Sequence, residues 1–308
     1  MQKAYKNENM EKSYCIFLDL LGFSKEVLQN CKDNRGQEHL LSLLKALKMA
    51  MSKFENNEEY SMKVFTDNIV IGVPLKRITE LSSWCPEDEI NEYGGYASGD
   101  ILSEIYENYF NSIINQVIFY QLEMMLNKFF VRGGWSCGHL YMDSKIVYGD
   151  ALIFSHDLES QKAIYPRIIL SDELKEMVER MIYNKAELVP FPYNRKYEIH
   201  GNPTIPQLLK AEDEIYFVNY LFETIEWENK SVNFKKIQMH KEIIIEMINT
   251  YSEDTRILEK YCWSAFYHNK FCEYFIGHFL GQKIDNELLI TDIPYVDEKW
   301  SINWIVYS

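Results

Sequence analysis

Two aspartates stand where short apolar strands are predicted to end. Asp19 follows the apolar run 14–18, and Asp67 lies in the turn between two apolar segments within residues 61–73. A carboxylate buried without a partner is costly, and two of them at strand ends of one sheet attract divalent cations, which relieve their repulsion. Two such ions can hold a triphosphate, activate a hydroxyl and stabilise a pyrophosphate leaving group. Either aspartate alone is more typical of a turn, but the pair favours a metal site.

Gly22 and Arg132 stand where a phosphate could bind. Gly22 follows Asp19 in the run Leu-Gly-Phe-Ser, and a glycine lets backbone amides at a helix start approach an anion. The alternative for Gly22 is a simple tight turn. Arg132 interrupts an apolar strand beside Gly133 and Gly134. A charge in such a strand needs a partner, and the sequence leaves open whether this partner is a phosphate or a carboxylate of the fold.

Lys63 precedes Asp67 by four residues. Four residues apart on a strand, they are expected to share a face, roughly 13 Å apart. This spacing fits a substrate that extends between its base and its phosphates, with the two side chains contributed by different protomers. The alternative is a solvated lysine on an edge strand.

The composition limits the classes of function. Of the 308 residues, 47% are hydrophobic, and the formal net charge is −14. This hydrophobic content is enough for a substantial core. Such an acidic chain is unsuited to a nucleic acid backbone, although it can bind a polyanionic small molecule when metal ions supply positive charge. The polar N-terminal residues lack the apolar core of a signal peptide, and no apolar run reaches the roughly 18 residues of a membrane span.

The cysteines and histidines give no sign of a metal centre. The six cysteines form no CxxC pair and lie mostly in apolar or aromatic segments, which favours reduced thiols in a cytoplasmic protein over disulfides or zinc ligands. The seven histidines show no metal-binding spacing, and His268, which lies among aromatic residues, is expected to be a hydrogen-bonded core residue.

The apolar patterns predict an α+β fold. Short apolar runs and alternation predict strands, at 14–18, 61–65 and 69–73 around a turn at 66–68, 129–141, 145–148, 168–170 and 215–218. Three- and four-residue spacing predicts two helical stripes, one of Leu40, Leu44, Leu47, Met51 and Phe54, the other of Ile101, Ile105, Tyr109, Ile113 and Val117. A third helix is expected after Ile168–Leu170, with Ser171 as its cap.

The order of these elements is strand, helix, hairpin, helix, hairpin, helix. It predicts a ferredoxin-like βαββαβ core, an antiparallel sheet with helices packed mainly on one face. Residues 75–100 contain acidic residues, a proline and a glycine pair, and are expected to form an inserted surface loop. From about 219 to 280 the patterns are helical and rich in aromatics. One compact domain with a helical C-terminal extension is therefore expected.

Together these residues resemble the class III nucleotide cyclases. That family combines a first-strand aspartate with a Gly-Phe phosphate loop, a hairpin with a second metal-binding aspartate, and a strand with an arginine and glycines. A Gly-Asp-Ala turn then begins a helix that ends Leu-Glu. The corresponding segments here are 19–23, Asp67, 132–138, 149–152 and 158–159, within a match of roughly residues 13–220.

Short segments are most similar to one branch, the pyrimidine nucleotide cyclases of the Pycsar anti-phage systems. They are Arg132-Gly133-Gly134, Gly149-Asp150-Ala151-Leu152, Tyr165-Pro166-Arg167-Ile168, Lys260-Tyr261-Cys262-Trp263 and Tyr267-His268-Asn269. The resemblance implies a catalytic domain at 1–220 and a helical extension at 221–308 that packs on it.

The resemblance also implies a reaction. The ribose 3′-hydroxyl of UTP or CTP would attack its own α-phosphate, giving 3′,5′-cyclic UMP or cyclic CMP and pyrophosphate. Asp19 and Asp67 would hold two Mn²⁺ or Mg²⁺ ions, with the carbonyl of Leu20 as a further ligand. The cyclic product would activate a separate effector protein in anti-phage defence.

Further residues are implied to bind the nucleotide. The amides of Gly22 and Phe23, together with Arg132, would hold the triphosphate, and Lys63 would contact the base. Because the family builds its sites across a dimer interface, the resemblance implies a homodimer. Each site would then combine the aspartate pair of one protomer with Lys63 of the other.

Two positions depart from the purine-specific members of the family. Those members place an asparagine and an arginine on the helix after the Gly-Asp-Ala turn, where Ile153 and Asp157 stand here. An aspartate cannot replace an arginine that stabilises anionic charge, which favours the pyrimidine branch. The alternatives are a purine (adenylate or guanylate) cyclase with an altered helix, and a catalytically inactive cyclase-like protein that binds a nucleotide or a protein partner.

Overall fold

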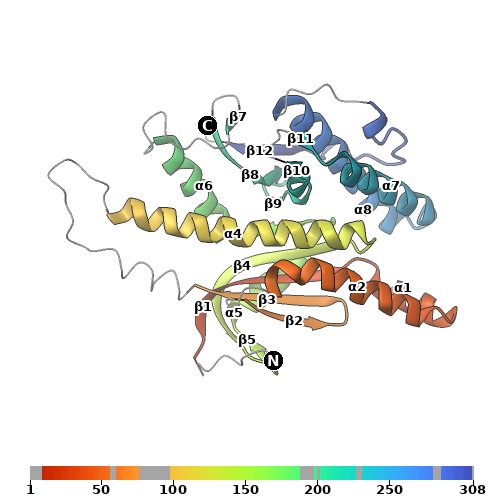
Figure 1. The fold of residues 1–308 in the computed structure, drawn as a ribbon, viewed down its shortest axis with the longest axis horizontal. Helices are drawn as coiled ribbons and strands as arrows, with labels where there is room; N and C mark the ends of the chain where they lie inside the picture. The colour runs from red at the N-terminus through yellow and green to blue at the C-terminus, as the bar shows by residue number, and fades with distance from the viewer. Residues whose placement is uncertain are drawn as a thin grey trace.

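The computed structural model describes residues 9–55, 60–75, 98–187, 198–199, 202–226, 231–279 and 286–306. The fold is α+β, built on one mixed sheet (Figure 1). Its strands are β1 (Glu11–Leu20), β2 (Ser61–Phe65), β3 (Asn68–Pro74), β4 (Val131–Met142), β5 (Val147–Tyr148), β6 (Ile168–Leu170), β7 (Glu198–Ile199), β8 (Asn202–Ala211), β9 (Tyr216–Val218) and β12 (Ile302–Val306). The surface loop predicted at 75–100 lies almost entirely outside the described residues.

The helices alternate with these strands in the first part of the chain. They are α1 (Phe23–Lys32), α2 (Gly36–Glu55), α4 (Ser98–Leu126), α5 (Asp150–Gln161), α6 (Asp172–Glu187), α7 (Phe234–Thr250) and α8 (Thr255–Phe271). Shorter helical turns are η1 (Tyr220–Thr224), η2 (Cys272–Phe279) and η3 (Asn286–Leu288), and β10 (Ile225–Glu226) pairs with β11 (Ser231–Val232) apart from the main sheet. The predicted order of strand, helix, hairpin, helix, hairpin and helix is confirmed.

The sheet follows the order β12-β8-β9-β6-β4-β1-β3-β2, with β5 on β4 and β7 on β8. Its pairs within the described residues are antiparallel except β4 with β6, which run parallel. The prediction of an antiparallel sheet is therefore wrong at this one pair. The reason is that α5 carries the chain from the end of β4 back to the level at which β4 begins. Such a crossover makes the next strand run parallel to β4.

The central strand β1 separates two apolar layers. Tyr14, Ile16 and Leu18 belong to the main core, whereas Cys15 packs on the opposite face. This alternation follows from the two-residue period of a strand. Asp19 follows Cys15 by four residues on β1, so both lie on the same face of the sheet, the one that α5 covers.

Helices α2 and α4 cover the main-core face. Figure 1 shows α4 across the middle of the view, with α2 close to the strands of the first half and α7 beyond α4. The predicted stripe on α2 is wrong in part, because Leu40 and Leu44 are exposed. The buried stripe is Leu43, Ala46, Leu47, Ala50 and Phe54. Its two alanines let the backbone of α2 come close to its neighbours.

The C-terminal region is mainly helical, as predicted, but it also returns to the sheet. Strand β12 pairs with β8, so the last described strand extends the same sheet as β1. The domain boundary at 220 stays a prediction. His268 is a hydrogen-bonded core residue, as expected: its Nδ1 lies 2.9 Å from Nδ1 of His240, and its Nε2 lies 2.8 Å from the carbonyl of Leu288.

The described cysteines are free, and four of the five are buried. Their burial agrees with the expectation that most cysteines lie in the core, and their reduced state stays a prediction. Within the part of the chain that the structure describes, no helix combines the length and apolar character needed to cross a membrane.

Small residues on β4 let α5 lie directly on the sheet. A Cβ at Gly134 would overlap the carbonyl oxygen of Ser155 and come within 2.6 Å of the Leu158 Cβ, and one at Gly138 would come within 2.6 Å of an Asp150 carboxylate oxygen. Between them, the Ser136 hydroxyl donates to the Ala151 carbonyl at 2.7 Å. The space beside Gly134 and Gly138 is therefore filled by α5.

This packing predicts a strong effect at Gly134. Gly134→Ala should lower the free energy of unfolding by about 1–3 kcal/mol, because the added methyl forces α5 off the strand. Ser160→Ala, at an exposed position of α5, should change it by less than about 0.5 kcal/mol. Urea unfolding of the two variants and the wild type measures both values. Equal stability of the two variants would contradict the described contact between α5 and β4.

Candidate active site at the end of the central strands

The two predicted metal ligands lie at the same edge of the sheet. Asp19 is paired in register with Asn68 of β3 and Arg132 of β4. Asp67 precedes Asn68 in the two-residue turn between β2 and β3, and its carbonyl accepts a hydrogen bond from the Leu20 amide at 3.1 Å. Strand pairing thus brings the ends of β1, β3 and β4 together and places both aspartates at this edge.

The turn itself orients Asp67. The Asp67 Oδ1 atom accepts hydrogen bonds from the Thr66 hydroxyl at 2.6 Å and the Asn68 side-chain amide at 3.1 Å. Thr66 has a positive φ of 52°, which a β-branched residue rarely adopts. Within the described residues, Asp67 Oδ2 and Asp19 Oδ1 accept no hydrogen bond, so each carboxylate has an oxygen available for a ligand.

Arg132 joins two carboxylates at this edge. Its Nε donates to Asp19 Oδ2 at 2.9 Å, and its Nη2 lies 2.8 Å from Glu159 Oε1 on α5. The side chains of Arg132, Asp19 and Glu159 are 24%, 16% and 5% exposed. Of the two partners that the sequence left open for Arg132, the described structure contains the carboxylates. A phosphate-binding role for Arg132 stays a prediction.

The local electrostatics reflect crowding of these charges. Burial raises the pKa of Asp19; the hydrogen bond and charge of Arg132 lower it, and the charge of Asp67 raises it. Burial likewise raises the pKa of Glu159, which Arg132 lowers and Asp19 raises. The charges of Asp19 and Asp67 are therefore close enough to repel each other, as expected for a pair that a cation would stabilise.

Lys260 of α8 belongs to the same electrostatic cluster. Burial lowers the pKa of its ammonium, and Arg132 and Arg256 lower it further, whereas Asp19 and Glu159 raise it. The C-terminal helix thus brings a half-buried cation to the edge where the aspartates lie.

The predicted phosphate loop lies beside Asp19 and Leu20. The Leu21 amide donates to the Phe130 carbonyl at 2.8 Å, and Gly22 has a positive φ of 77°, which suits glycine. Helix α1 begins at Phe23, and its N-terminus has no side-chain cap. First-turn amides without a side-chain acceptor are able to bind an anion.

Lys63 lies on β2 and not on a common strand with Asp67. The strand ends at Phe65, and Asp67 is in the following turn. The inference that Lys63 and Asp67 share a strand face is therefore wrong, because the chain reverses before it reaches Asp67. The Lys63 ammonium is 6.0 Å from the Phe65 ring centroid, and β2 is the terminal strand of the described sheet.

The residues present fit a divalent metal only as part of a site that a substrate completes. No group of three or more His, Cys, Asp or Glu side chains with metal-binding geometry occurs among the described residues. Asp19 and Asp67 supply two carboxylates and Leu20 a carbonyl. Mg²⁺ is commonly held by one or two carboxylates together with substrate phosphates, so this donor set fits two ions bound with a triphosphate.

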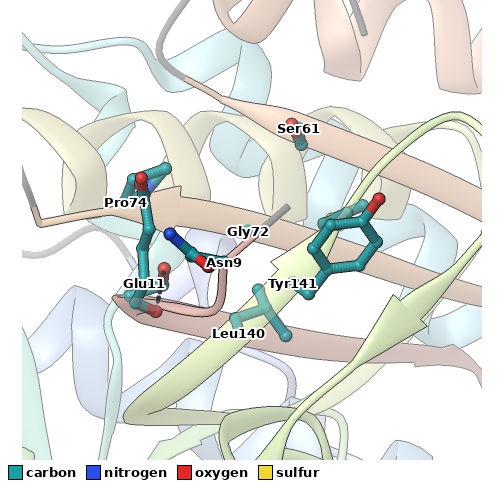
Figure 2. A pocket seen from close by; sticks show the side chains of 9 residues that line it. Asn9, Glu11, Ser61, Gly72, Pro74, Leu140 and Tyr141 are labelled. Carbon is teal, nitrogen blue, oxygen red and sulfur yellow. Dashed lines mark hydrogen bonds between the residues drawn. The ribbon is translucent and has the colours of Figure 1, made fainter. Parts of the chain in front are cut away.

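A separate pocket lies at the opposite ends of the same strands. Figure 2 shows Glu11, Pro74, Leu140 and Tyr141 around it, with Ser61 of β2 nearby. It contains none of the predicted site residues. We place the candidate site at the Asp19 edge because that edge gathers the ionisable groups.

The resemblance to the cyclases includes Glu159 and Lys260 only within similar segments and implies no role for either residue. Glu159 had a detectable signal: Ala151, Ser155 and Glu159 follow at four-residue steps and form the buried face of α5. A carboxylate at the end of a small-residue face indicates a partner on the strand beneath. Lys260 had no such signal, because its position depends on how the C-terminal region packs.

In comparisons with known proteins, no family model matches the chain and no curated protein matches its sequence.

The arginine bridge predicts a measurable stability effect. Arg132→Met should lower the free energy of unfolding by about 3 kcal/mol, because it leaves two largely buried carboxylates without their cation. Lys128→Met is a suitable control, because the pair of Lys128 with Glu246 is about half exposed and such pairs contribute less than about 1 kcal/mol. Chemical denaturation at neutral pH gives both values.

A second substitution tests the same bridge. Adding Glu159→Gln to Arg132→Met should restore part of the lost stability, since it removes one unpaired charge. If Arg132→Met costs no more than Lys128→Met, the bridge does not contribute as described.

Proposed function

We propose that this protein is a pyrimidine nucleotide cyclase, which converts UTP or CTP to 3′,5′-cyclic UMP or cyclic CMP and pyrophosphate. The observation that carries the proposal is the meeting of Asp19 and Asp67 at one strand edge, with an oxygen of each carboxylate available. Beside them lie the uncapped start of α1 and the cations Arg132 and Lys260. This combination of hard oxygen ligands, backbone amides and cations suits a metal-bound triphosphate.

The chain's own residues have distinct tasks in the proposed reaction. Asp19, Asp67 and the Leu20 carbonyl would hold two Mg²⁺ or Mn²⁺ ions, which when bound lower the pKa of the attacking hydroxyl and neutralise the leaving group. The amides of Gly22 and Phe23 would hold the phosphates in line with the ribose. Orientation of this kind supplies much of the rate in phosphoryl transfer.

The bond changes balance without a further reactant. The 3′-oxygen forms a bond to the α-phosphorus, and the bond from that phosphorus to the bridging oxygen of the β-phosphate breaks. Pyrophosphate leaves with the bonding electron pair, and the proton of the 3′-hydroxyl passes to water. The departures at Ile153 and Asp157 support a pyrimidine rather than a purine product, because the purine-type asparagine and arginine are missing.

The product is the first test. With an equal mixture of ATP, GTP, CTP and UTP and with Mn²⁺, we expect cyclic UMP or cyclic CMP as the main product by mass spectrometry. Asp19→Asn and Asp67→Asn should each lower turnover at least about 100-fold, because each removes a metal-binding charge. Asp292→Asn, at an exposed position outside the site, should leave turnover unchanged.

Other outcomes of this assay have clear meanings. A dominant cyclic AMP or cyclic GMP peak would instead favour a purine cyclase. Absence of pyrophosphate release with every nucleotide would favour a nucleotide-binding protein without activity. Near-normal turnover of Asp19→Asn at saturating Mn²⁺ would refute the two-metal assignment.

We further propose that the protein acts as a homodimer with two composite sites and that its product activates a separate effector. The terminal position of β2 in the described sheet supports a role for Lys63 toward a second protomer. Each site would take its aspartate pair from one protomer and Lys63 from the other, related by a two-fold axis.

Mixing inactive variants tests this arrangement. If Asp67→Asn and Lys63→Ala homodimers are both inactive, equal mixing with subunit exchange gives about half heterodimers, each with one intact site. Activity should recover to about a quarter of the wild-type value. No recovery, with exchange verified by mass spectrometry, would exclude sites shared between protomers in this way. Full activity of Lys63→Ala alone would exclude a base-binding role for Lys63.

A further inference from the structure

Helix α8 is fixed beside the Asp19 edge by several contacts from the first part of the chain. Lys25 of α1 pairs with Asp254, the N-terminal cap of α8, at 2.9 Å. Phe130 lies two residues before Arg132, and its ring contacts the ring of Tyr261 on α8 at a centroid distance of 4.8 Å. Contacts with both α1 and the start of β4 therefore hold the first turns of α8 at the candidate site.

Additional contacts restrict the same helix. Tyr251 lies just before α8 in the chain, and its hydroxyl donates to Glu26 of α1 at 3.2 Å. The Tyr165 hydroxyl donates to Glu259 of α8 at 3.3 Å. Glu259 is the neighbour of Lys260. The position of Lys260 is thus set by contacts on both sides of it along the chain.

The two cations of the site differ in how they are engaged. The Nε and Nη2 of Arg132 already contact Asp19 and Glu159. The Lys260 ammonium makes no hydrogen bond or ion pair with any residue that the structure describes, although it lies within electrostatic range of Arg132, Asp19 and Glu159. Three donors of a half-buried ammonium without a protein acceptor are available to an anion.

We infer that Lys260 is a phosphate-binding residue, which brings the C-terminal helix into the site by contacting the β- or γ-phosphate of the nucleotide triphosphate. An incoming triphosphate carries more negative charge than the two carboxylates already paired with Arg132. Lys260 is a half-buried cation nearby whose donors need not leave a protein partner. This inference rests on the proposed function and extends it to a residue outside the predicted catalytic domain.

Arg256 provides the matched control. It lies one turn before Lys260 on the same helix and is also cationic, and it interacts electrostatically with Lys260, but its side chain is exposed. If the helix attracted an anion only through its overall positive charge, which solvent and salt screen, substitution of either residue would weaken anion binding by a similar, small factor. If Lys260 contacts the phosphate directly, only substitution of Lys260 should strongly weaken phosphate binding.

The test measures binding of inorganic tripolyphosphate with Mn²⁺ to the full chain by isothermal titration calorimetry. Lys260→Met should weaken binding by at least about 10-fold, which is the loss of one charge-assisted hydrogen bond. Lys260→Arg and Arg256→Met should each stay within about threefold of the wild type. Thermal unfolding without ligand checks that Lys260→Met is folded, and Lys260→Gln replaces it if its melting temperature falls.

Two results would overturn the inference: equal binding by Lys260→Met and the wild type, or no binding by the wild type. A structural role alone would lower the melting temperature without a selective loss of tripolyphosphate binding. Because this probe needs no turnover, tripolyphosphate binding without any cyclic product contradicts the proposed function only. Cyclic product from Lys260→Met with an unchanged KM contradicts the inference only.

Discussion

The bridge from Arg132 to Asp19 and Glu159 is the interaction on which the candidate site depends. It joins three elements, β1, β4 and α5, at the edge where the strands end. A guanidinium suits this position because its planar fork offers donors in two directions and keeps its charge when buried. Without it, two carboxylates would remain in an environment where burial already disfavours their charged forms.

The bridge requires that α5 lie directly on β4, and the small residues of that strand permit this approach. Gly134 and Gly138 contribute no side chain where the α5 backbone passes, and Ser136 contributes a hydroxyl that the helix uses. Close packing and charge placement are therefore coupled here, because Glu159 meets Arg132 only when the helix is this close. A change that lifts α5 would also separate the ion pairs.

The acidic character of the whole chain contrasts with the local arrangement at this edge. A net charge of −14 disfavours binding of a polyanion to the protein in general, whereas Arg132, Lys260 and Arg256 interact electrostatically with one another beside Asp19. Local cations and any bound metal ions act over short range, while distant charges are screened by salt. A triphosphate would therefore meet local positive charge at the Asp19 edge of a protein that is acidic as a whole.

The sequence alone determined the order of elements, the buried strand that ends at Asp19 and the turn that holds Asp67, because apolar runs and turn chemistry are local properties. It also identified Asp19, Asp67 and Arg132 as residues in need of partners. The tertiary structure decided that Glu159 is a partner of Arg132 and that Asp67 lies in a turn beyond the strand that contains Lys63. It also brought Lys260 to the site from a helix more than 100 residues beyond Arg132 in the chain. It also decided that the buried stripe of α2 is the one with alanines, and that β6 runs parallel to β4. These features depend on which distant segments pack together, and the local pattern of a sequence does not specify that choice.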